Sequence, residues 1–126
     1  MKSKSHSETY WKASNILKNE KSTEKDYLDA IEYLEETIQK EPDFFYAKLE
    51  LAVAFHRLAD SFTHRIPDCP DDLIQELISG IKTSYRKTIL YYGNALRLCS
   101  DNNKTRGELF FSQHFYILIS GLIKLI

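Results

Sequence analysis

Glycine and proline are scarce in this chain, with 4 glycines and 3 prolines among 126 residues. A sandwich or barrel of short strands needs many tight turns, and these two residue types supply most of them. Their scarcity therefore favours helices joined by few loops. Apolar residues make up 43% of the chain, which is ordinary for a single globular domain and argues against global disorder.

An excess of charge of one sign is also lacking, since 17 basic and 18 acidic residues leave a net charge of −1. No basic surplus is present to neutralise a phosphate backbone, so we expect no nucleic-acid partner. Cys69 and Cys99 form no CxxC pair, and reduced thiols in a cytoplasmic protein are expected. The opening residues, MKSKSHSETYWK, have no apolar stretch after their lysines, so no secretory signal is predicted.

Apolar residues recur at steps of three and four in five stretches, which predicts an all-α chain of about five antiparallel helices. Residues 1–7 are polar and are expected to form a flexible N-terminus, whereas residues 8–126 are expected to form a single helical domain. The breaks between the stretches are predicted at the charged run 19–25, at Pro42, at the loop 66–72 and at residues 100–103.

Two local features carry further expectations about the helices. Asp43 follows Pro42 and is a candidate N-cap for the third helix, predicted from about residue 44 to about residue 63. Gly80 and Gly93 lie inside the fourth stretch, which is predicted to span about 28 residues. Because glycine costs about 1 kcal/mol relative to alanine inside a helix, we expect a kink or a close helix contact at either position.

The order of apolar and small residues in these stretches repeats along the chain. The first unit reads Tyr10-x2-Ala13-Ser14-x2-Leu17, then Ala30-x3-Leu34, then Pro42; the second opens with Lys48-x2-Leu51-Ala52-x2-Phe55 and continues with Thr88-x3-Tyr92; the third opens with Glu108-x2-Phe111-Ser112-x2-Phe115. This arrangement resembles the tetratricopeptide repeat, a helix–turn–helix unit with the pattern W-x2-L-G-x2-Y, A-x3-F and P.

The spacing of the units departs from the 34 residues of that family. Ser14 and Ala52 are 38 residues apart, and the charged run 19–25 accommodates the excess. Ala52 and Ser112 are 60 residues apart. The resemblance therefore implies tetratricopeptide-like helical hairpins, with an elongated second hairpin followed by a C-terminal helix.

Tetratricopeptide repeats usually bind a peptide or helix of another protein in a groove lined by the first helix of each pair. The resemblance thus implies a protein-interaction module or adaptor, which is not an enzyme and needs no cofactor. The groove positions carried onto this chain are Trp11, Asn15, Lys18 and Asn19 in the first unit, Tyr46, Leu49, Val53, His56 and Arg57 in the second, and Arg106, Leu109, Gln113 and Tyr116 in the third. In a plainer interpretation, Leu49, Val53 and Leu109 pack on the next helix.

His56, Asp60 and His64 follow one another at steps of four, which places two imidazoles and a carboxylate on one helix face. Such a row offers ligands to a metal, so a helical enzyme or metal-binding protein is an alternative function. No second helix supplies the glutamate and histidine that complete a di-metal site. We therefore expect no metal, and a solvated helix edge is the simpler interpretation.

Residues 110–126 are apolar nearly all round, as in a helix that is buried or lies in a membrane. From Phe115 to Ile126 there are 12 residues, fewer than the roughly 20 that a membrane span needs, and Lys124 interrupts them. A membrane-associated adaptor is therefore a less favoured alternative. The other interpretations are packing along the second hairpin, pairing with another copy as a homo-oligomer, or cover by a further helix.

Overall fold

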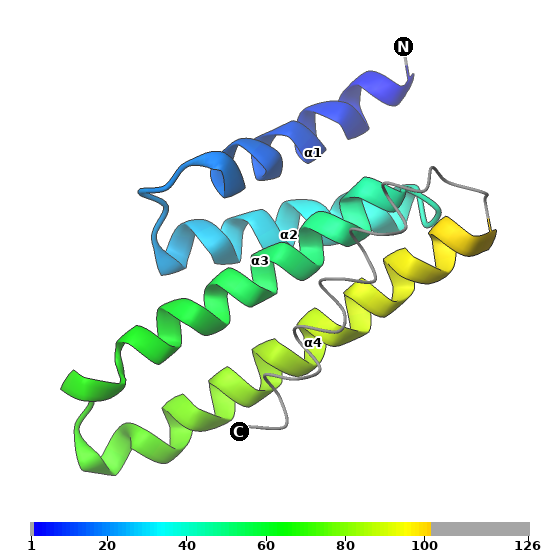
Figure 1. Cartoon of the computed structure of the whole chain (residues 1–126). Coiled ribbons are helices and arrows are strands. Elements are labelled where there is room, and N and C mark those ends of the chain that lie inside the picture. Colours follow the sequence, from blue (N-terminus) through cyan, green and yellow to red (C-terminus); the bar gives the residue numbers. More distant parts are fainter. Residues whose placement is uncertain (1, 102–126) are drawn as a thin grey trace.

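The computed structural model describes the backbone of residues 2–101 and the side chains of residues 8–98 (Figure 1). Over this range the chain forms four α-helices and no strand: α1 (Lys2–Lys18), α2 (Glu24–Lys40), α3 (Phe45–His64) and α4 (Ile74–Asp101). Two short 3-10 turns, η1 (Ile66–Asp68) and η2 (Asp71–Leu73), join α3 to α4. The all-α prediction is confirmed, and the helix predicted from residue 105 onward lies outside the described residues.

Helix α2 begins at a capping box that satisfies two backbone N–H groups. The Thr23 side chain accepts a hydrogen bond from the Asp26 backbone N–H at 3.3 Å, and the Asp26 carboxylate accepts one from the Thr23 N–H at 2.8 Å. Residues 24 and 25, which were predicted to belong to the charged loop, therefore already lie in α2.

Removal of this cap is expected to destabilise the protein. Thr23→Ala loses the side-chain acceptor, so the free energy of unfolding should fall by about 1 kcal/mol. Thr83→Ala is the matched control, because Thr83 is exposed inside α4 and alanine is the better helix former. Urea unfolding followed by circular dichroism measures both variants, and equal midpoints would contradict the capping role of Thr23.

Two helices start elsewhere than the sequence predicts. Helix α1 begins at Lys2, within residues 1–7, because no glycine or proline there interrupts a helix that the apolar residues further on stabilise. The prediction of Asp43 as the N-cap of α3 is wrong, since the N-cap is Phe44 and makes no side-chain capping hydrogen bond. Phe44 packs on Tyr10 with ring centroids 4.9 Å apart, so an apolar contact with α1 fixes the start of α3.

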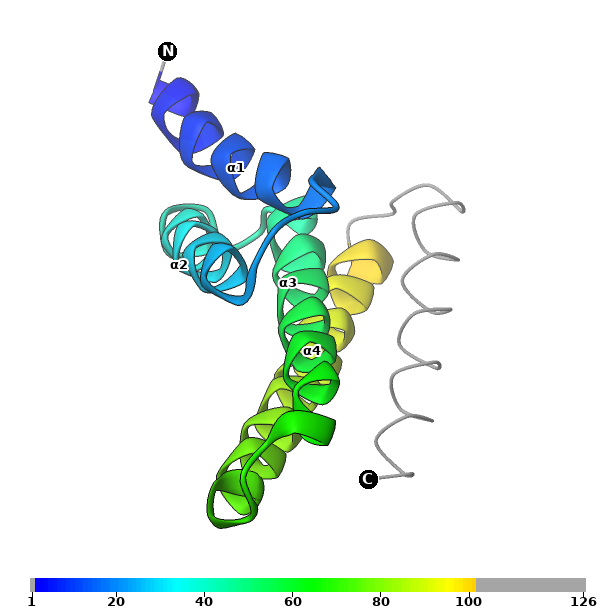
Figure 2. The same cartoon turned by 90° about the vertical axis from the view of Figure 1, so that its left-hand side faces the viewer.

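Helix α3 is the centre of the fold, with α2 and α4 on different sides of it (Figure 1 and Figure 2). Helix α1 contacts both α2 and α3. The largest apolar cluster joins these three helices through Tyr10, Ala13, Leu17, Ala30, Ile31, Leu34, Ala47, Leu51, Ala54, Phe55 and Leu58. Two smaller clusters join α3 to α4, namely Phe45, Leu49, Ala52, Tyr92 and Ala95, and Ala59, Leu77, Ile81 and Tyr85.

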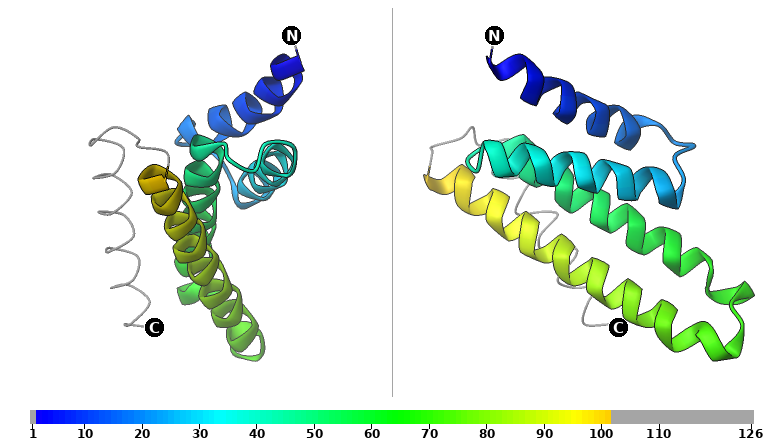
Figure 3. Two further views of the ribbon diagram at one scale, coloured as in Figure 1. Left: turned by 90° about the vertical axis from the view of Figure 1, so that its right-hand side faces the viewer. Right: turned by 180° about the vertical axis from the view of Figure 1, so that it is seen from behind.

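Helices α3 and α4 form an antiparallel hairpin with 20 and 28 residues, longer than the hairpin of α1 and α2 with 17 residues each (Figure 3). Gly80 of α4 faces Phe62 of α3, and a Cβ atom at Gly80 would lie 3.5 Å from the Phe62 ring. The close helix contact predicted for a glycine of α4 is therefore present at Gly80.

Candidate functional site

Three of the predicted groove residues lie in one exposed row on α1. Trp11, Asn15 and Lys18 are exposed and are separated by four and three residues, so they share one side of the helix. The Trp11 side chain is 50% exposed, and the Lys18 ammonium lies 5.3 Å from the centre of its ring, a cation–π distance. The row presents a large aromatic surface beside a positive charge.

The structure separates the predicted groove residues of α3. Tyr46 is 44% exposed at the first turn of the helix, and Val53 and His56 are half-buried further along. Leu49 is buried against Tyr92 of α4, so it is a core residue, as in the plainer interpretation of the sequence. The four candidates of the third unit, Arg106, Leu109, Gln113 and Tyr116, lie outside the described residues.

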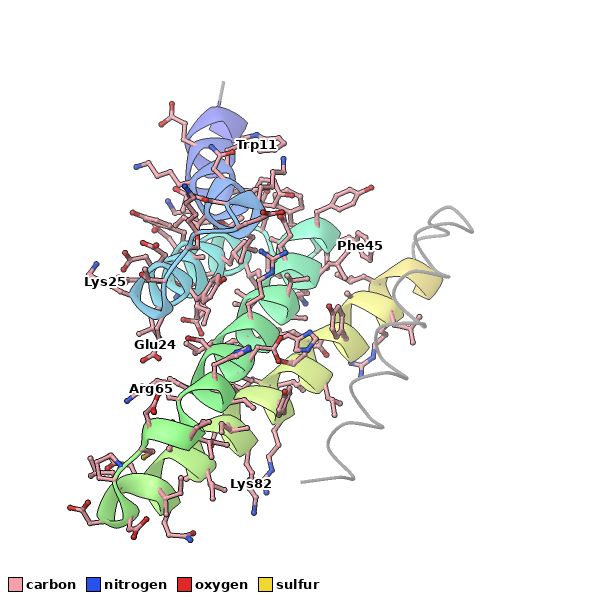
Figure 4. All side chains as sticks on the ribbon, turned by 60° about the vertical axis from the view of Figure 1, so that its left-hand side comes forward. Trp11, Glu24, Lys25, Phe45, Arg65 and Lys82 are labelled. Atoms are coloured by element: carbon pink, nitrogen blue, oxygen red, sulfur yellow. The ribbon has the colours of Figure 1, made fainter. Side chains whose placement is uncertain are left out.

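A run of aromatic rings connects the exposed row of α1 to the start of α3. Trp11 contacts Tyr10 at a ring-centroid distance of 5.1 Å, and Tyr10 contacts Phe44 at 4.9 Å. Phe45 follows and contacts Tyr46 at 5.0 Å. Trp11 and Phe45 are seen at the same end of the molecule in Figure 4. The two exposed rings, Trp11 and Tyr46, thus each pack against the aromatic residue that precedes them in the sequence.

Two polar contacts hold α1 against α3. The Glu50 carboxylate of α3 lies beside the Tyr10 hydroxyl of α1, and burial together with Glu50 raises the pKa of Tyr10 above its ordinary range. The Arg57 guanidinium donates to the backbone carbonyl of Leu17, in the last turn of α1, where the helix dipole favours a positive charge. Arg57, which the sequence placed in the groove, therefore holds the C-terminal end of α1 in place.

His56 has its polar partner on the same helix. Its Nε2 atom is 3.8 Å from Oδ2 of Asp60, and the Tyr85 hydroxyl of α4 donates to Oδ1 of Asp60 at 3.1 Å. Burial lowers the pKa of His56, while the Asp60 carboxylate acts in the opposite direction and Arg57 adds to the lowering. Burial and Asp60 raise the pKa of Tyr85. These side chains link α3 to α4, and only part of the His56 ring faces solvent.

The row of His56, Asp60 and His64 does not converge on one point. Nδ1 of His64 lies 2.7 Å from the backbone carbonyl oxygen of Asp60, whereas His56 turns toward the Asp60 carboxylate. In the described part of the chain, no three histidine, cysteine, aspartate or glutamate side chains are grouped so that they could hold a metal ion. Nor does any helix there combine the length and the apolar character needed to cross a bilayer.

Sequence reasoning missed the contacts that join α1 to α3. Arg57 and Leu17 are 40 residues apart, and so are Glu50 and Tyr10, so no local pattern reports either pair. The sequence places Arg57 among the groove positions and Glu50 directly after one of them, Leu49, but neither placement identifies the partner on α1. Periodicity therefore finds the exposed row of α1 but not the contacts that hold α1 against α3.

Comparisons with protein-family models, with curated proteins and with solved structures find no match for this chain. The likeness to the tetratricopeptide repeat therefore depends on the spacing of Ala13, Ser14, Leu51 and Ala52 and of the large residues around them. These four residues are all buried between helices.

Proposed function

We propose that this chain is a protein-interaction module of the tetratricopeptide type, which binds an extended peptide or a helix of another protein along the exposed side of α1 and α3. The observation that carries the proposal is the pair of exposed aromatic side chains, Trp11 and Tyr46, held by buried contacts. Tryptophan and tyrosine are enriched among the residues that contribute most to protein–protein binding. The activity is binding and requires no catalytic group.

The packing of the helices supports this proposal. Helix α1 contacts α2 and α3, and α3 contacts α2 and α4, which is the neighbour pattern of one helical hairpin stacked on the next. Tyr10–Glu50 and Arg57–Leu17 hold α1 and α3 together before any partner arrives. A preformed surface loses less conformational entropy on binding. Lys18 beside Trp11 favours a partner that carries a carboxylate next to an apolar side chain.

Replacement of both exposed rings is expected to abolish partner capture. In a lysate pull-down, Trp11→Ala/Tyr46→Ala should lose the proteins that the native chain retains, and mass spectrometry identifies them. Leu73→Ala is the matched control, because Leu73 is 47% exposed but lies in η2, outside the α1–α3 side. Circular dichroism shows whether each variant is folded. Equal capture by the native chain and a folded double variant would contradict the proposal.

Trp11 is the single tryptophan of the chain, so its fluorescence reports directly on this surface. Titration of the identified partner should move the emission to shorter wavelength as the indole leaves water. Tyr46→Ala should raise the dissociation constant of that partner about thirtyfold, which corresponds to the roughly 2 kcal/mol of binding free energy typical of such aromatic residues. A saturable interaction with unchanged Trp11 emission would place the binding site on another surface.

A further inference from the structure

Helices α2 and α4 carry opposite charge on their solvent faces. Helix α2 contains six acidic residues, at positions 24, 26, 29, 32, 35 and 36, and two basic residues, Lys25 and Lys40. Between residues 77 and 98, α4 contains four basic residues and no acidic residue. Glu32 and Glu35 of α2 and Arg86 of α4 are exposed, Lys82 of α4 is half-exposed, and none of the four makes an ion pair with a described residue.

Each charged face also exposes a leucine. Leu28 of α2 is 50% exposed and Leu90 of α4 is 56% exposed. Leu28 lies one turn before Glu32, and Leu90 lies one turn after Arg86, so each leucine adjoins the charges of its face. An apolar centre with a charged rim is the usual composition of a contact surface.

The two faces do not pair within one copy. Helices α2 and α4 lie on different sides of α3 (Figure 2), and no ion pair between described residues joins them. Glu24 of α2 instead binds Arg65 after α3, with Oε1 and Nη1 3.1 Å apart; the two residues are labelled in Figure 4. Within the described part of the chain, no ion pair therefore joins these two complementary charged faces.

We propose that the acidic face of α2 in one copy binds the basic face of α4 in a second copy. The spacing favours an antiparallel contact. With Leu28 against Leu90, Glu32 meets Arg86, because each lies four residues from its leucine in opposite chain directions; Glu35 then reaches Lys82 one turn further. After one such contact forms, the first copy still has a free basic face and the second copy a free acidic face. Further copies can therefore add at both ends, so the assembly is open and is not a closed dimer. It does not involve the α1–α3 side.

Sedimentation velocity of the full chain tests this contact. At about 50 mM salt the mean sedimentation coefficient should rise with protein concentration and pass the value of a dimer. At about 500 mM salt it should return to that of the monomer, because exposed ion pairs are screened. A monomer at every concentration and both salt levels would overturn the proposal, even if that monomer bound anionic phosphatidylserine vesicles through Arg86.

Charge reversal supplies the decisive variants. Glu32→Lys/Glu35→Lys makes both faces basic and Lys82→Glu/Arg86→Glu makes both acidic, so each should weaken self-association by at least about tenfold. An equimolar mixture of the two variants should associate again, because opposite charges then meet in both contacts.

The control variant is Asp71→Lys/Asp72→Lys, which changes the net charge as much as the α2 variant does but lies in η2, and it should associate like the native chain. Failure of the mixture to associate would overturn the proposed contact. An equal loss of self-association in the control variant would also overturn it. A closed dimer that none of the variants changes would overturn it as well, because self-association would then depend on another part of the chain.

Discussion

Leu51→Ala is expected to lower the free energy of unfolding by about 2–5 kcal/mol, the largest effect of any single substitution considered for this chain. Leu51 is 0% exposed and lies in the cluster that joins α1, α2 and α3, where it packs among Leu34, Ala47 and Phe55. Truncation leaves a cavity that three helices must close at once. Since small domains are stable by about 5–15 kcal/mol, the variant should be partly unfolded well below the native midpoint.

Leu28→Ala is the control for Leu51→Ala. It removes the same atoms from a side chain that is 50% exposed, so the free energy of unfolding should change by less than about 0.5 kcal/mol. Urea unfolding monitored by circular dichroism measures both variants. Midpoints for Leu51→Ala and Leu28→Ala that shift by the same amount would contradict the central place of Leu51 in the core.

Alkaline pH is expected to destabilise the fold through two buried tyrosines. Burial raises the pKa of Tyr92, and burial together with Glu50 raises the pKa of Tyr10. Below about pH 10 both phenols are protonated whether the chain is folded or not, so their full contribution is present. Above that pH the unfolded chain releases protons that the folded chain retains, and each tyrosine removes about 1.4 kcal/mol of stability per pH unit until the folded pKa is reached.

Tyr10→Phe/Tyr92→Phe tests this pH dependence. The double variant keeps the two rings but has no phenol to ionise, so its free energy of unfolding should fall less steeply above about pH 10, by roughly 2.7 kcal/mol per pH unit for the pair. Urea unfolding at intervals between about pH 9 and pH 11.5 gives both curves. Parallel curves for the native chain and the double variant would show that other groups cause the alkaline loss.

The sequence predicts the long helices closely and their partners poorly. The third helix was expected from about residue 44 to 63 and runs from Phe45 to His64, because its apolar residues repeat over five turns. Asp43 failed as a cap because the aromatic contact of Phe44 with Tyr10 joins residues of different helices. Capping rules describe contacts within one helix, whereas the start of α3 depends on a contact with α1.

In the candidate site, too, the sequence predicts what depends on one helix and misses what depends on a neighbouring helix. Trp11 and Lys18 were predicted on an exposed row and are exposed. Leu49 occupies an equivalent groove position in the repeat pattern, yet it is buried against Tyr92. The helical period gives the direction in which a side chain points around the axis of its helix. It does not show which of these directions a neighbouring helix covers. The long α4, whose path depends on the loop after α3, decides that question for Leu49.

The central place of α3 has a consequence for the cooperativity of folding. Its residues complete the apolar cluster of the first hairpin through Leu51 and that of the second through Leu49, so neither hairpin has its whole core without this helix. Loss of order in α3 exposes both clusters together, whereas fraying of α1 exposes only one. The smallest unit that folds in an all-or-none manner is therefore larger than one helical hairpin, and a fragment cut after Pro42 would keep its pattern but lack the helix that makes it stable.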